Sequence, residues 1–155
     1  MLRRFLKIGV ASMLIVASTP LTASAHNAEF EADLDPGQET PAVESDGEGE
    51  AEFKLRRDKV RFHVEWEDLT SGAVAGHIHC APTGSPGPVG VTLLSEPKGT
   101  DGMVKGWFDG PDAGNDCGWT SLDDVIVAMA IGNAYVNIHT ATFPGGEIRG
   151  QIAID

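Results

Sequence analysis

The sequence lacks the motifs that mark the most familiar enzyme classes. It contains no H-E-x-x-H metalloprotease motif, no glycine-rich phosphate-binding loop and no Ser/His/Asp arrangement with supporting motifs. It has only two cysteines and no C-x-x-C spacing, which argues against a thiolate metal site. Internal repeats, coiled-coil heptads and low-complexity tracts are also missing. These absences favour a non-enzymatic role.

Basic residues are scarce beyond the first 25 positions. Residues 26–155 contain 8 of the 11 lysines and arginines but all 23 acidic residues, which gives this part a net charge of −15. Such a charge argues against binding to nucleic acid and against docking on anionic lipid. It suits a cationic partner or a metal ion, although solubility alone is a simpler explanation.

The N-terminus has the pattern of a secretory signal peptide. Arg3, Arg4 and Lys7 form a basic start, the apolar run 8–17 is too short to span a membrane, and residues 23–25 form an A-x-A cleavage site. The spacing after the arginine pair is one residue short of a twin-arginine signal, so the ordinary export route is favoured.

This pattern predicts a signal peptide over residues 1–25 and a single mature domain over residues 26–155, secreted or periplasmic, with no membrane insertion. In an oxidising compartment, Cys80 and Cys117 are expected to form one disulfide. The domain is expected to be a monomer.

Most of the chain alternates between apolar and polar residues, as strands with one buried face do. Residues 60–67 show this best, with Val60 and Phe62 on one face and Arg61 and His63 on the other. Turn signals separate the segments, which points to an all-β fold: a Greek-key-like antiparallel β-sandwich or barrel of about eight strands. The expected strands cover residues 28–34, 50–55, 60–67, 74–80, 89–94 and 103–108, with a final hairpin over 134–154. The second arm of this hairpin is expected to place Ile148, Ile152 and Ile154 on one face.

One short helix is expected before the final hairpin. Ser121 can cap it, apolar residues recur at helical spacing from Leu122 to Met129, and Gly132 can end it. We expect this helix to cover one open end of the β core.

Three motifs resemble those of the CHRD (chordin) domain family. They are Gln38–Val43 near the N-terminus, His77-Ile78-His79 with Gly84 and Gly87-Pro88-Val89 in the centre, and Asn133–Thr140 with Pro144–Gln151 at the C-terminus. They occur in the family's order and together cover about residues 28–154. The resemblance implies an all-β extracytoplasmic domain and implies little about activity.

Three histidines form a candidate metal site. His77 and His79 are two apart and therefore point to the same side of their strand, and His139 lies on the polar side of another strand. Three imidazoles on a rigid sheet suit copper and, less well, zinc. The arrangement is similar to the copper site of Cu/Zn superoxide dismutases, but only in arrangement. Alternatively, the histidines hydrogen-bond backbone carbonyls or the side chains of Glu147 and Asn137.

Other polar residues have simpler interpretations. Glu147 and Arg149 are expected to be structural, either as an ion pair or with Arg149 bonding loop carbonyls. A mature N-terminal His26 could chelate copper, but a frayed terminus is the plainer interpretation. The acidic loop around Asp112 does not match an EF-hand.

Three hypotheses for function remain at this point. The first is an exported binding or interaction module whose partner is a protein or an extracellular matrix component. The second is a copper (or zinc) protein that uses His77, His79 and His139. The third and weakest is a hydrolase that uses His139 with Glu147 as an acid–base pair.

Overall fold

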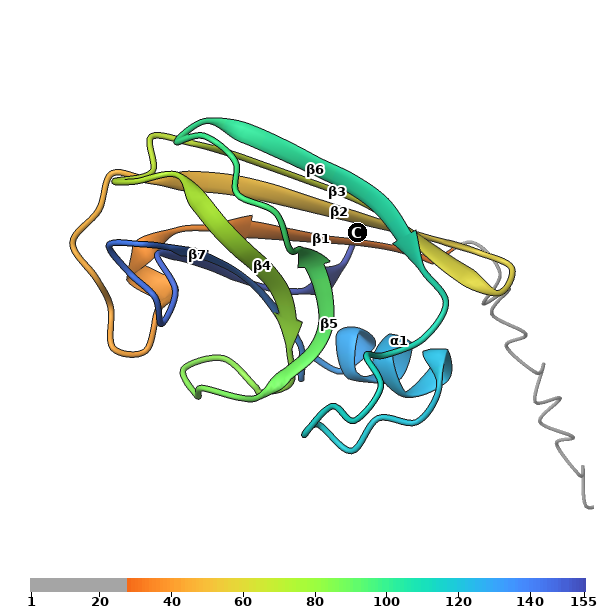
Figure 1. Cartoon of the computed structure of the whole chain (residues 1–155). Helices are drawn as coiled ribbons and strands as arrows, with labels where there is room; N and C mark the ends of the chain where they lie inside the picture. Colours follow the sequence, from red (N-terminus) through yellow and green to blue (C-terminus); the bar gives the residue numbers. More distant parts are fainter. Residues whose placement is uncertain (1–27) are drawn as a thin grey trace, which may run out of the picture.

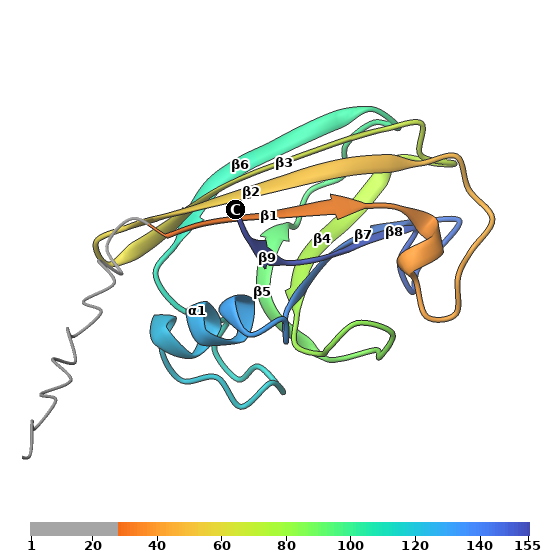
Figure 2. The same ribbon diagram turned by 180° about the vertical axis from the view of Figure 1, so that it is seen from behind.

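The computed structural model describes residues 28–155, so the predicted signal peptide, its cleavage site and His26 lie outside the described residues. Two antiparallel sheets face each other, with the strand orders β6-β3-β2-β1-β9 and β5-β4-β7-β8 (Figures 1 and 2). The strands are β1 (Glu29–Leu34), β2 (Glu48–Arg56), β3 (Lys59–Glu67), β4 (Ala73–His79), β5 (Val89–Leu94), β6 (Gly102–Phe108), β7 (Tyr135–Thr140), β8 (Ile148–Gln151) and β9 (Ala153–Ile154). The predicted all-β sandwich is confirmed.

Strict alternation explains the five-stranded sheet. In β3, Val60, Phe62, Val64 and Trp66 are all buried, while the residues between them face outward. Strands β2 and β3 pair along their whole lengths, so the apolar residues of both strands enter one core. Burial of these side chains against the second sheet stabilises the sandwich by about 1.5–3 kcal/mol for each large residue.

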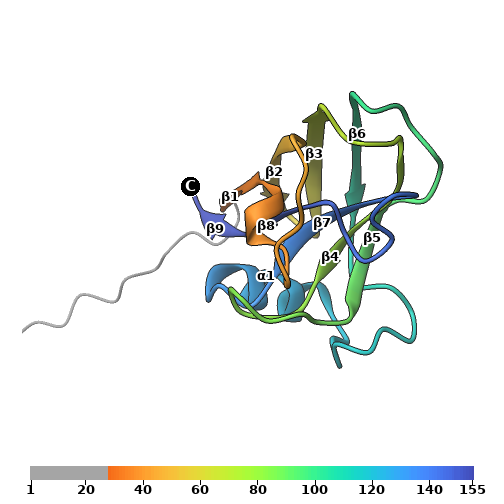
Figure 3. The same cartoon turned by 90° about the vertical axis from the view of Figure 1, so that its left-hand side faces the viewer.

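Strand β7 of the four-stranded sheet follows a different pattern because both of its faces are covered. All six residues of β7 are buried. Val136 and Ile138 lie in the core between the sheets, and the residues that alternate with them lie on the opposite face, beneath loops. A short 3-10 helix, η2 (Pro36–Gln38), follows β1 and lies beside β8 (Figure 3).

The end of the chain differs from the predicted hairpin. The predicted second arm, with Ile148, Ile152 and Ile154 on one face, is interrupted at Ile152, which bonds the carbonyl oxygen of Ala134. After this point β9 joins the other sheet and pairs with β1, and Ile154 is exposed (Figure 2). The prediction of one face for all three isoleucines was therefore wrong, because the chain crosses from one sheet to the other.

Helix α1 (Leu122–Ala130) has the predicted position and cap. The Ser121 hydroxyl accepts a bond from the Asp124 amide, and the Asp124 carboxylate accepts one from the Ser121 amide, which completes a capping box. Val125 and Met129 are fully buried, and α1 lies at one end of the sandwich (Figure 1). The predicted Cys80–Cys117 disulfide is present. No helix in residues 28–155 is long and apolar enough to cross a membrane.

Candidate metal site

Neighbouring strands bring the three predicted histidines together. Strand β4 carries His77 and His79, and β7 carries His139. These strands pair antiparallel, with His77 opposite Asn137 and His79 opposite Tyr135. The register of β4 is irregular against both of its neighbours, and such irregularities re-aim side chains. The three rings consequently lie in one cluster on the loop-covered face of the four-stranded sheet.

The ring nitrogens are close enough to share one ion. One nitrogen from each of His77, His79 and His139 lies within 4.8 Å of the others. The Nε2 atoms of His79 and His139 are 3.4 Å apart. With metal–nitrogen bonds of about 2.0 Å, this separation corresponds to an N–metal–N angle of roughly 115°, close to tetrahedral or trigonal geometry. In residues 28–155 no second group of three such ligands occurs.

Backbone carbonyls fix the tautomers of two of the rings. The Nδ1 of His79 lies 2.9 Å from the carbonyl oxygen of Gly87, and the Nδ1 of His139 lies 3.1 Å from that of Pro144. A carbonyl oxygen can only accept, so each Nδ1 must carry the proton. In the neutral rings the two facing Nε2 atoms therefore both present lone pairs. Two lone pairs repel at this distance unless a proton or a metal ion lies between them.

Burial disfavours the protonated, charged form of all three rings. It lowers the pKa of His77 to about 4, helped by the neighbouring His139 and opposed by Asp112. Burial likewise lowers the pKa of His79 to about 4, against the bond to Gly87. It also lowers the pKa of His139. At neutral pH all three rings are therefore neutral, which is the form that binds metal.

The third ring is the most accessible. His79 and His139 are only 7% and 9% exposed, whereas His77 is half-buried. The Nδ1 of His77 is buried and has no hydrogen-bond partner within residues 28–155.

The ring of His79 stacks on Tyr135, and Tyr135 in turn contacts Arg149. The ring of Tyr135 lies parallel to that of His79 with 5.0 Å between centroids. The guanidinium carbon of Arg149 lies 3.5 Å from the Tyr135 ring centroid. Arg149 is buried and donates to the Thr40 hydroxyl and the Pro82 carbonyl, as one of the two sequence-based alternatives expected. This arrangement holds the His79 ring in one orientation.

Glu147 is a structural residue, as expected, but within residues 28–155 it bonds neither Arg149 nor a histidine. Its carboxylate is fully buried and accepts bonds from the Ser45 hydroxyl, the Thr70 amide and the Thr140 hydroxyl. Burial alone would raise its pKa, but these hydrogen bonds outweigh it and lower the pKa. It forms no ion pair with Arg149 and no bond to a histidine in the described part of the chain. The geometry thus provides no His139–Glu147 pair.

Asn137 also does not bond the histidines; instead it faces Glu39, a residue that the sequence-based site omits. A Cβ atom at Gly146 would collide with both side chains, so all three groups are in close proximity. Burial raises the pKa of Glu39 to about 7, despite Arg149 nearby and the bond from Asn137. Glu39 belongs to the Gln38–Val43 motif, and the convergence of the terminal motifs was the signal that could have indicated this contact.

The remaining candidate residues do not join the site. His63 lies on the outer face of the five-stranded sheet, 3.9 Å from Glu65. Asp112 accepts a bond from the Thr92 hydroxyl, and its backbone carbonyl accepts one from the Asn115 amide. The loop around Asp112 is therefore a polar turn, as expected.

Comparison with known protein families places the chain in a family. The CHRD domain model matches residues 30–152, most of the chain. The protein therefore belongs to the CHRD domain family. No curated protein and no solved structure gave a match.

Proposed function

We propose that this protein is an exported metal-binding domain that holds one copper ion, or less favourably zinc, through His77, His79 and His139. The observation that carries the proposal is the pair of Nε2 atoms of His79 and His139, which face each other at 3.4 Å while both Nδ1 atoms donate to carbonyls. A carbonyl that fixes the tautomer of a histidine is the usual outer partner of a metal ligand.

The choice of copper rests on the ligand chemistry. Three neutral imidazoles bind both metals, but Cu(II) forms the more stable complexes with nitrogen ligands. With three protein ligands, a fourth position stays available to water or a partner's ligand. The half-buried His77 lies on the more accessible side of the cluster. Such a site suits the uptake and delivery of a metal ion. The disulfide is typical of exported proteins, which meet both metals outside the cytoplasm.

The test is a copper titration with matched variants. The purified, metal-free protein receives one equivalent of Cu(II), and its electron paramagnetic resonance spectrum is recorded for hyperfine coupling to imidazole nitrogens. We expect His79→Ala and His139→Ala to show coupling to two imidazoles in place of three and to bind copper at least 100-fold more weakly, since each removes one of three ligands.

Two histidine variants serve as controls. His63→Ala removes a histidine from the other sheet, and His26→Ala removes the one that could chelate at a mature N-terminus. Both should keep the spectrum and affinity of the unmodified protein. A spectrum that changes only in His26→Ala would place copper at the N-terminus and refute the proposed site.

A further inference from the structure

The outer face of the five-stranded sheet separates its charges by sign. Alternation directs every second residue of β1, β2, β3 and β6 to this face. One end forms an acidic half, made of Asp33, Glu48, Glu50, Glu65 and Glu67. The other end forms a basic half, made of Lys54, Arg56, Lys59 and Arg61, beside which Glu29 of β1 pairs with Lys54 and Arg56. The basic half thus contains half of the eight basic residues in positions 26–155.

Within each half, like charges lie directly opposite one another. Glu48 pairs with Glu67 and Glu50 with Glu65 in the acidic half. In the basic half, Lys54 lies opposite Arg61 and Arg56 opposite Lys59. Such cross-strand pairs destabilise a sheet, and interchanging residues between the halves would turn them into ion pairs. Within residues 28–155, ion pairs offset part of this repulsion only at Lys54 and Arg56, which pair with Glu29 and Glu52.

The two halves cannot neutralise each other. Glu50 and Lys54 are four residues apart on β2, or about 13 Å along the strand. Charges on a solvated surface are largely screened beyond about 8 Å at physiological ionic strength. Each half therefore presents its own field to a partner.

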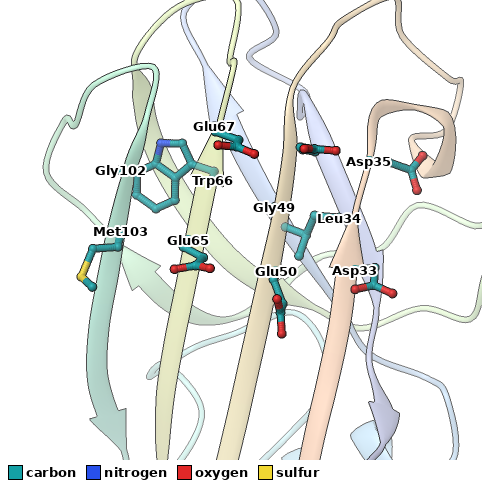
Figure 4. Close-up of a pocket in the computed structure, with 11 residues that line it drawn as sticks. Asp33, Leu34, Asp35, Gly49, Glu50, Glu65, Trp66, Glu67, Gly102 and Met103 are labelled. Atoms are coloured by element: carbon teal, nitrogen blue, oxygen red, sulfur yellow. The ribbon is translucent and has the colours of Figure 1, made fainter.

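The acidic half is not a small-ion site. Figure 4 shows Asp33, Glu50 and Glu65 projecting from three neighbouring strands around a depression of about 650 Å³. Within residues 28–155, only the histidine cluster brings three possible ligands within 4.8 Å of one another. The carboxylates are spread along the strands instead, which suits a partner with an equally extended surface.

The strand register makes this face complementary to itself. A two-fold axis can run parallel to the sheet and at right angles to its strands, directly above the row of Glu52 and His63. It places each strand over the same strand of a second copy but reverses its direction. Four oppositely charged pairs then face each other twice: Glu48 with Arg56, Glu50 with Lys54, Glu65 with Arg61 and Glu67 with Lys59. We propose that two copies of this chain associate through this face.

Apolar residues on the edge strand follow the same symmetry. Met103 is 44% exposed opposite Glu65, and Trp107 is 61% exposed opposite Arg61. The two-fold axis brings Met103 of one copy over Trp107 of the other, a favourable sulfur–aromatic contact. Some contacts are unfavourable: Glu31, Glu52 and Lys105 share the row of the axis, so each faces its own copy. On β1, Asp33 also faces Glu29, although Glu29 already pairs with Lys54 and Arg56 of its own chain.

The size of the face limits the strength of the association. Four strands about 4.8 Å apart and about 30 Å long cover roughly 600 Å² per copy. Stable complexes bury about 800 Å² per partner, so this dimer is expected to be weak. Because ion pairs dominate it, its affinity should fall at least tenfold between about 20 mM and 500 mM NaCl. The proposal replaces the sequence-based expectation of a monomer and is independent of the metal site.

A charge-swap experiment tests the proposal by sedimentation velocity of the purified protein. Glu50→Lys/Glu65→Lys places lysines opposite Lys54 and Arg61 of the second copy, and Lys54→Glu/Arg61→Glu places glutamates opposite its Glu50 and Glu65. We expect the unmodified protein to dimerise in low salt and each double variant to remain a monomer. An equimolar mixture of the two should dimerise again, which also shows that both variants are folded.

The control variant is Glu44→Lys/Glu96→Lys. It changes the net charge as Glu50→Lys/Glu65→Lys does, but in exposed loops away from this face. It should dimerise like the unmodified protein. An unmodified protein that stays monomeric in low salt at about 500 μM would overturn the proposal, because even weak interfaces of this size associate at such concentrations. Binding to polyphosphate through the basic half without self-association would overturn it as well and would indicate an anionic polymer as the partner.

Discussion

The lowered pKa values of the histidines should make metal binding almost independent of pH between pH 7 and pH 5. A free imidazole with a pKa of about 6.5 is only about 3% neutral at pH 5. Three such ligands would weaken metal binding by roughly 10⁴-fold over this interval, since each must lose a proton first. In the folded protein, the pKa values of His77 and His79 are already near 4, and that of His139 is also lowered. We therefore expect a loss of less than about tenfold.

Proton release gives the same test in a second form. At pH 6, three ordinary histidines would release about two protons for each metal ion bound, whereas these rings should release close to none. Calorimetric titration of Zn(II) in buffers with different ionisation enthalpies measures this number. His63→Ala should behave like the unmodified protein. Release of two protons at pH 6, or a 10⁴-fold loss of affinity by pH 5, would refute the argument that burial keeps these rings neutral.

Three predictions concern the residues around the site. Glu147→Gln should lower the free energy of unfolding by about 3 kcal/mol or more in urea denaturation, because three donors lose a charged acceptor in a buried position; a loss below about 1 kcal/mol would show that these bonds matter little. Gly146→Ala should lower the free energy of unfolding by at least about 2 kcal/mol, since Gly146 has a φ of +128° and a Cβ would collide with Asn137 and Glu39. Gly145→Ala, with open space around it, is the control. Because the pKa of Glu39 is raised, the folded protein favours the protonated form of this side chain. The free energy of unfolding should therefore fall as the pH rises toward about 7. Glu39→Gln should therefore be more stable than the unmodified protein by about 1–3 kcal/mol at pH 8 and similar to it at pH 5, and thermal unfolding that shows no such pH-dependent difference would contradict the raised pKa.

Much of the fold was predictable because alternation and caps are local signals. Val60 to Trp66 already indicated which face of β3 is buried, and Ser121 and Gly132 marked the ends of the helix. The crossing at Ile152 was not predictable, because it depends on a bond to Ala134 and on pairing with β1. Such contacts join residues far apart in the sequence and leave no periodic trace.

The candidate site was likewise predictable from local spacing but not from long-range contacts. Spacing placed His77 and His79 on one side of a strand, but only the pairing of β4 with β7 brings His139 to them. The carbonyl partners of the rings belong to loops whose paths the sequence does not specify. For the same reason, Glu147 was expected beside a histidine but lies among hydroxyl groups. Glu39 was not considered because its contacts are with residues about 100 positions away.

The most direct measurement is X-ray absorption spectroscopy of the protein loaded with one equivalent of copper. The proposed site predicts imidazole scattering from three nitrogen ligands at about 2.0 Å in the unmodified protein. The number of imidazoles should fall to two in His77→Ala and stay at three in His63→Ala. A spectrum that shows one imidazole or none would contradict the claim that the three histidines share a metal ion. A spectrum that is unchanged in His77→Ala would contradict it as well.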